Sequence, residues 1–167
     1  AELCEISQPS IGLITNIGKA HLEGFGSFEG VKKAKSELYN YLQKNDSPVF
    51  INGDNKVLLN LADGLFHHTY GKSEANQIIG RLEQSDDHLS LAWKKHNYFG
   101  YTLPISTNLV GDYNFENVLA AICIGNYFEL SPEQITTGIE SYLPSNNRSQ
   151  LINKNSNKII LDAYNAN

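Results

Sequence analysis

The sequence predicts an α/β protein, with a mostly parallel sheet flanked by helices and a small antiparallel ribbon. Residues 11–54 contain an apolar run, a glycine-rich loop, an amphipathic helical pattern and a second apolar run. A helix between two strands most simply packs as the crossover that joins parallel strands. Residues 78–103 change to short segments separated by turn residues, and the segment at 89–93 alternates apolar and small side chains, which is typical of antiparallel strands.

The first part begins with an apolar run at 11–17, which we expect to be a strand, followed by a loop at 18–27. The helix that follows has apolar side chains at the spacing of one helix face, namely Val31, Ala34, Leu38, Tyr41 and Leu42. Ser27 is a suitable N-cap for this helix. The next strand is expected at 49–52.

The middle part is expected to form the antiparallel ribbon from three segments, at 78–82, 89–93 and 98–103. Helical spacing returns between residues 114 and 128, set by Phe115, Val118, Leu119, Ile122 and Cys123.

The last part is expected to open with a helix that begins at Ser131. The sequence Ser-Pro-Glu-Gln is a capping box with proline at the first helical position. Residues 145–158 are polar and rich in asparagine, which predicts mostly loop. A final apolar run at 159–161 predicts a strand.

Composition excludes several classes of function. Thirteen Lys and Arg against eighteen Asp and Glu give a net charge of -5, so binding to nucleic acid through bulk charge is not expected. No apolar run approaches the ~20 residues of a membrane span. The two cysteines, Cys4 and Cys123, and the lack of a signal-peptide pattern indicate a reduced compartment, so we expect a cytoplasmic protein.

Residues 12–20 bear a superficial likeness to a phosphate-binding P-loop. That motif needs four residues between its first glycine and the Gly-Lys pair, followed by Ser or Thr. Here five residues separate Gly12 from Gly18, and Ala20 follows Lys19. We therefore expect no phosphate cradle in this segment.

Lys35 and His21 are candidates for metal-dependent chemistry. Lys35 lies at the edge of the apolar helix face, and a lysine partly removed from water keeps some neutral amine, which can attack a carbon centre or form a metal-binding carbamate. The alternative is a surface lysine whose stem lies along the core. His21 follows the first strand, at the ligand-facing end of a parallel sheet, although a structural loop histidine is the alternative. Together they could reach one divalent metal ion.

Four further residues have side chains that suit a nucleotide. Asn114 and Asn117 are three residues apart at a helix start, so both amides can face one side and pair with adenine, although Asn114 could instead be a simple N-cap. Arg148 lies in a polar loop and suits phosphate oxygens, with a surface arginine as the alternative. Asp162 follows an apolar strand, where a carboxylate can hold ribose hydroxyls.

Five separate segments resemble motifs of the Mur ligases, the ATP-dependent amide ligases that build the peptidoglycan precursor. They are residues 14–27, 33–37, 111–121, 144–150 and 162–167. Their order and wide separation argue against a chance similarity. Within the family, the sequence is most similar to the ligases that add D-alanyl-D-alanine to UDP-N-acetylmuramoyl-tripeptide.

The resemblance implies a role for each candidate metal residue. His21 would be a magnesium ligand, and Lys35 would be the carbamylated lysine that bridges to Mg²⁺ near the acceptor substrate. The implied reaction activates the substrate carboxylate with ATP as an acyl phosphate, which the amine of D-alanyl-D-alanine then attacks.

The resemblance also implies roles around the nucleotide. Asn114 and Asn117 would lie near ATP, with Asn117 towards the adenine. Arg148 would contact the phosphates, and Asp162 would contact the ribose.

The resemblance further implies that residues 1–161 are part of a central ATP-binding domain and that 162–167 form a hinge. The family's UDP-sugar-binding domain, its Gly-Lys-Thr loop, an acidic magnesium ligand and its amino-acid-binding domain have no counterpart in the 167 residues. We therefore expect a fragment that is inactive by itself. We also expect the protein to be a monomer.

Two other functions remain open from the sequence. A folylpolyglutamate synthase has a similar layout, but it is not expected to contain the motifs at 144–150 and 162–167. A binding or regulatory module could have kept the fold and lost the phosphate loop.

Overall fold

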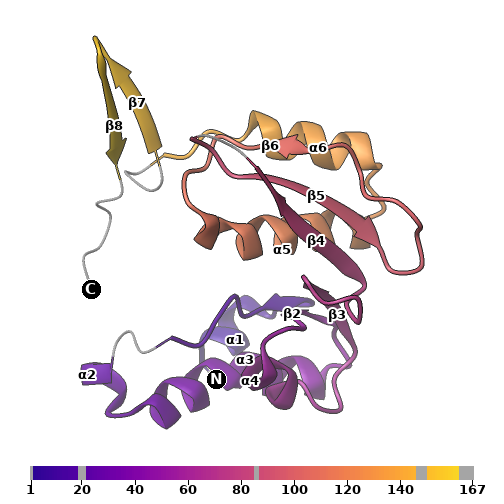
Figure 1. Cartoon of the computed structure of the whole chain (residues 1–167). Helices are drawn as coiled ribbons and strands as arrows, with labels where there is room; N and C mark the ends of the chain where they lie inside the picture. The colour runs from indigo at the N-terminus through magenta and orange to yellow at the C-terminus, as the bar shows by residue number, and fades with distance from the viewer. Residues whose placement is uncertain (1, 19–21, 85–86, 146–149, 162–167) are drawn as a thin grey trace. The chain divides into compact units, whose positions relative to one another are not determined.

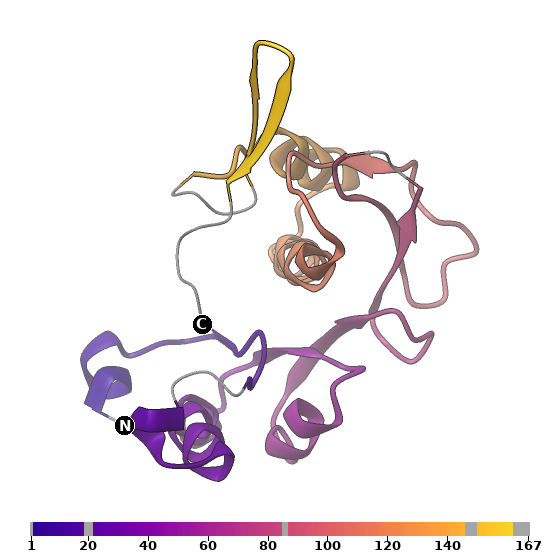
Figure 2. The same ribbon diagram turned by 60° about the vertical axis from the view of Figure 1, so that its left-hand side comes forward.

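The computed structural model describes residues 2–18, 22–84, 87–145 and 150–161. The chain separates into two compact units, residues 1–77 and 78–167, and each is described by itself (Figures 1 and 2). Within the described residues, no helix has the length and apolar character that crossing a membrane requires.

The first unit is a parallel α/β arrangement. Its strands are β1 (Gly12–Leu13), β2 (Val49–Asn52) and β3 (His67–Gly71), and both β1–β2 and β2–β3 pair in parallel. The crossover helices are α3 (Phe28–Lys44) and α4 (Lys56–Leu61), which lie on the same side of the strands in both views (Figures 1 and 2). The predicted parallel class is confirmed, although β1 is shorter than the expected strand at 11–17.

Helix α3 begins and packs largely as its sequence predicts. The Ser27 hydroxyl accepts a 3.1 Å hydrogen bond from the Gly30 amide, which confirms the N-cap. Val31 and Leu42 are buried, and so is Tyr39, which the predicted face did not include. The core of the unit consists of Ile14, Tyr39, Leu42, Val49, Ile51, Leu58, Ala62 and Leu65.

Two short helices of this unit have no clear sequence signal. Helix α1 (Glu2–Ser7) has no buried residue, and α2 (Leu22–Phe25) is a single turn before α3. Short helices lack the repeated apolar spacing on which the prediction of α3 depends.

The loops that follow β2 and β3 are joined by one carboxylate. Asp54 accepts hydrogen bonds from the backbone amides of Lys72 (2.5 Å) and Ser73 (3.3 Å). It also accepts one from Nδ2 of the buried Asn76 at 2.9 Å. Because the carboxyl ends of parallel strands meet at one edge of the sheet, this contact holds together the two loops at that edge.

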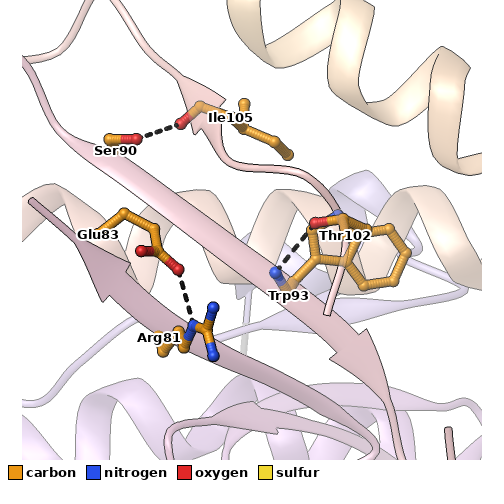
Figure 3. Close-up of polar contacts among 6 residues, drawn as sticks. All are labelled: Arg81, Glu83, Ser90, Trp93, Thr102 and Ile105. Carbon is orange, nitrogen blue, oxygen red and sulfur yellow. Dashed lines mark hydrogen bonds and ion pairs between the residues drawn. The ribbon is translucent and has the colours of Figure 1, made fainter. Parts of the chain in front are cut away.

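The second unit contains the predicted antiparallel ribbon. Strands β4 (Ile78–Glu83), β5 (Ser90–Lys95) and β6 (Ile105–Ser106) pair antiparallel, β4 with β5 and β5 with β6. Figure 3 shows two side-chain contacts of β5: Ser90 donates to the Ile105 carbonyl, and Thr102 accepts from the Trp93 amide.

The expectation of a strand at 98–103 is wrong. This segment is a loop, and the third strand begins only after Pro104. Tyr98 is 63% exposed and Phe99 is fully exposed, so no second layer covers these two side chains, which suggested a strand. An apolar segment without a packing partner gains little from the extended conformation.

Two helices complete the unit, α5 (Phe115–Tyr127) and α6 (Pro132–Ser141), and both were predicted. All five apolar residues that set the spacing of α5 are buried. Gly80 of β4 faces α5, and a Cβ there would overlap the Leu119 side chain, so the close approach of strand and helix requires glycine. Ser131 and Gln134 form the predicted capping box.

The expectation of loop is also wrong over most of residues 150–158, whereas residues 146–149 lie outside the described residues. Strands β7 (Gln150–Lys154) and β8 (Asn157–Leu161) form a hairpin, which includes the predicted strand at 159–161. Lys154 pairs with Asn157, which leaves Asn155 and Ser156 as a two-residue turn. Asn155 has φ 57°, a conformation that asparagine tolerates better than most residues, so this asparagine suits the turn of the hairpin.

Candidate nucleotide-binding cleft

The polar side chains at the start of α5 are positioned by a tight turn. Gly111 has φ 89°, and a Cβ there would lie 2.5 Å from the Tyr113 ring, so the turn requires glycine. A single 3-10 turn, η1 (Asp112–Asn114), then leads directly into α5. Asn114 therefore lies at the junction of the two helices.

Asn114 does not cap the helix through its side chain, which removes the simpler interpretation of this residue. The side chain is buried, at 8% exposure, and its Nδ2 donates a 3.0 Å hydrogen bond to the Val110 carbonyl. Its Oδ1 accepts a hydrogen bond of 3.4 Å from Nδ2 of the exposed Asn117. The structure thus brings the two predicted amides together on one side of α5.

Both asparagines line a cleft of about 510 Å³ within the second unit, between α5 and α6. This volume is typical of a small-molecule site. The remaining lining is Leu109, Val118, Ala121, Gly125, Leu130, Gln134, Ile135, Gly138, Ile139 and Tyr142. None of these described lining residues is charged at neutral pH, so the cleft suits a neutral heterocycle better than a phosphate group.

Lys35 lies in the first unit, in a separate hollow of about 620 Å³. The residue is exposed, and its Nζ donates a 2.7 Å hydrogen bond to the Asn16 carbonyl. Asn16 comes soon after β1, so Lys35 is held at the carboxyl end of the parallel strands. Sequence reasoning did not find Asn16, because a backbone carbonyl gives no residue-type signal.

The other predicted site residues, His21, Arg148 and Asp162, lie outside the described residues. Among the residues that are described, no group of three or more His, Cys, Asp or Glu side chains is arranged to hold a metal ion.

Burial shifts three ionisable groups in the cores. It raises the pKa of the Cys123 thiol on α5 to about 12 and that of the Tyr39 phenol on α3 to about 12. It lowers the pKa of His68, whose ring stacks on Phe50 at 5.6 Å, and a hydrogen bond with Gln77 partly opposes this shift. Each shift favours the neutral form, as expected where water is excluded.

Comparison with known proteins identifies the family. The Mur ligase middle domain matches residues 1–125, and the chain belongs to this family. It is 33% identical over 98% of its length to the UDP-N-acetylmuramoyl-tripeptide--D-alanyl-D-alanine ligase of Bacillus subtilis (strain 168). It is 34% identical over 86% of its length to the ligase of the same name from Synechocystis sp. (strain ATCC 27184 / PCC 6803 / Kazusa).

The chain spans about a third of the length of these relatives, 35% of the first and 30% of the second. Solved structures agree on the fold. MurF from Acinetobacter baumannii superposes with a TM-score of 0.81 at 24% identity, over 98% of this chain and 36% of that one. The MurF ligase of Thermotoga maritima in complex with ADP gives a TM-score of 0.78 at 20% identity, over 98% of this chain and 38% of that one.

Proposed function

We propose that this chain is the central ATP-binding part of a longer cytoplasmic ligase that joins D-alanyl-D-alanine to UDP-N-acetylmuramoyl-tripeptide in peptidoglycan precursor synthesis. The observation that carries the proposal is the 33% identity to the Bacillus subtilis ligase across 98% of the chain. The alignment therefore covers the antiparallel ribbon and the hairpin as well as the segments that resemble family motifs.

The cleft between α5 and α6 supports the nucleotide part of the proposal. Its apolar walls fit the faces of a purine, and the amide of Asn117, which Asn114 contacts, supplies a donor and an acceptor at one edge. Arg148 would hold the phosphates and Asp162 the ribose.

ATP, when bound with Mg²⁺, supplies the phosphoryl group that activates the substrate carboxylate for attack by the amine of D-alanyl-D-alanine. The chain's own residues would orient the reactants. His21 would serve as a metal ligand, and Lys35, as a carbamate, would bridge to the metal near the acceptor. The hydrogen bond from Lys35 to the Asn16 carbonyl supports this role, because it already holds the side chain at the carboxyl end of the strands.

A substitution at Lys35 in the longer ligase tests the proposal. Lys35→Ala should abolish ligation, and a small added carboxylate should restore part of the activity by replacing the carbamate. The matched control is Lys33→Ala, because Lys33 is an exposed lysine on the same helix that does not line the hollow. Full activity in Lys35→Ala, or equal losses in the two variants, would contradict the proposed role.

A further inference from the structure

Two hydrogen bonds fix the direction in which the Asn114 amide faces. A backbone carbonyl can only accept, so the group 3.0 Å from the Val110 oxygen must be the Nδ2 donor. The Oδ1 of Asn114 is then directed to Asn117. Because the side chain is 8% exposed, water has little access with which to compensate for a reversed amide.

The orientation of Asn114 in turn determines that of Asn117. Oδ1 of Asn114 lies 3.4 Å from Nδ2 of Asn117 and accepts its hydrogen bond. A reversed Asn117 amide would place two oxygen acceptors against each other. The Val110 carbonyl therefore sets the orientation of Asn117, which lies at the cleft, through Asn114.

This orientation leaves Asn117 with a particular set of free groups. Its Oδ1 remains an acceptor, and the second hydrogen of its Nδ2 remains a donor. An asparagine amide pairs in this way with the N6 amine and N7 of adenine. Guanine has the carbonyl oxygen O6 where adenine has the N6 amine. The Oδ1 acceptor of Asn117 would then face the O6 acceptor of guanine, and no hydrogen bond would form there.

We propose that Asn114 is a positioning residue that fixes the amide of Asn117 and thereby makes the cleft select adenine over guanine nucleotides. The inference rests on the proposed function, since it requires that the base occupies this cleft. It adds a residue that acts on specificity without contacting the base.

Two variants separate this role from a structural one. Asn114→Leu removes the hydrogen bonds to the Val110 carbonyl and from Asn117, so Asn117 can reverse. The ratio of the GDP and ADP dissociation constants should then fall by about fivefold or more. Asn114→Asp also loses the donor to Val110 but keeps an acceptor facing Asn117, so the ratio should stay near that of the unsubstituted protein. If the role of Asn114 were purely structural, the ratio of dissociation constants would change by the same factor in the two variants.

The measurement is calorimetric titration of the longer ligase with ADP and with GDP, accompanied by urea unfolding of each variant. Asn108→Ala is the matched control, because Asn108 donates to the Glu140 and Tyr142 carbonyls in the same unit and does not line the cleft. It should change stability and leave the nucleotide ratio unchanged. An unchanged ratio in Asn114→Leu, or equal falls in the Leu and Asp variants, would overturn the inference.

Two further measurements keep the test decisive. Asn117→Ala should weaken ADP binding; if it does not, the cleft is not the base site and the proposed placement of ATP fails. If Asn117→Ala weakens binding while Asn114→Leu keeps the ratio, only the positioning role fails. Should the Asn114 variants not fold, inosine diphosphate tests the unsubstituted protein, because hypoxanthine also has the carbonyl. Binding as tight as that of ADP would refute the fixed orientation.

Discussion

The contact between Gly80 of β4 and Leu119 of α5 supports a quantitative prediction. Leu119 is fully buried, and its side chain occupies the space that a Cβ on Gly80 would need. Leu119→Ala removes three carbon atoms beyond Cβ, which at about 0.8 kcal/mol each is about 2.4 kcal/mol of transfer free energy. The cavity left behind raises the expected loss of unfolding free energy to about 3 kcal/mol.

Gly80→Ala should cost about 1–3 kcal/mol, because the added methyl group overlaps the leucine. In the double variant, alanine at 119 leaves room for the methyl group at 80. The combined loss should therefore be smaller than the sum of the single losses by about 1 kcal/mol or more.

Urea unfolding followed by tryptophan fluorescence measures all four proteins. The chain has one tryptophan, Trp93, which is 2% exposed and lies opposite Gly80 in the β4–β5 pair, so the signal reports on this core. Losses that add within about 0.3 kcal/mol would refute the packing of α5 against Gly80.

Three other substitutions or reactions have defined outcomes. Asp54→Ala should lower the unfolding free energy by about 1–3 kcal/mol because three donors lose their acceptor, and Asp54→Asn should lose less; equal losses would contradict this account. Ser131→Ala should lower the unfolding free energy by about 1 kcal/mol because it removes the capping box. A melting temperature equal to that of the unsubstituted protein would contradict this prediction. In a thiol titration at pH 8 Cys4 should react first, because burial raises the pKa of Cys123 to about 12 and keeps that thiol protonated; equal rates for both would be inconsistent with the structure.

The sequence predicts best those helices that have apolar side chains at helical spacing over several turns or a clear N-cap. Helices α3, α5 and α6 follow directly from apolar spacing and from Ser27 and Ser131. The segment at 98–103 is a loop although it is rich in aromatic side chains, because such side chains favour a strand only where a second layer buries one face. The hairpin at 150–161 was missed because a polar two-residue turn and a polar loop have similar composition.

The candidate site was predictable in residue type and not in arrangement. The spacing of Asn114 and Asn117 correctly placed both amides on one side of α5. That Asn114 is buried and bonded to the Val110 carbonyl could not be predicted, since backbone carbonyls are the same at every position. The roles of His21, Arg148 and Asp162 stay predictions.

The central claim is that this chain supplies the ATP-binding part of a D-alanyl-D-alanine-adding ligase. The most direct test incubates the longer protein with UDP-N-acetylmuramoyl-tripeptide, D-alanyl-D-alanine, Mg²⁺ and ATP, and detects the product by mass spectrometry. The account predicts UDP-N-acetylmuramoyl-pentapeptide with one ADP formed per product, and little product with GTP. No pentapeptide, or pentapeptide formed without ATP, would contradict it.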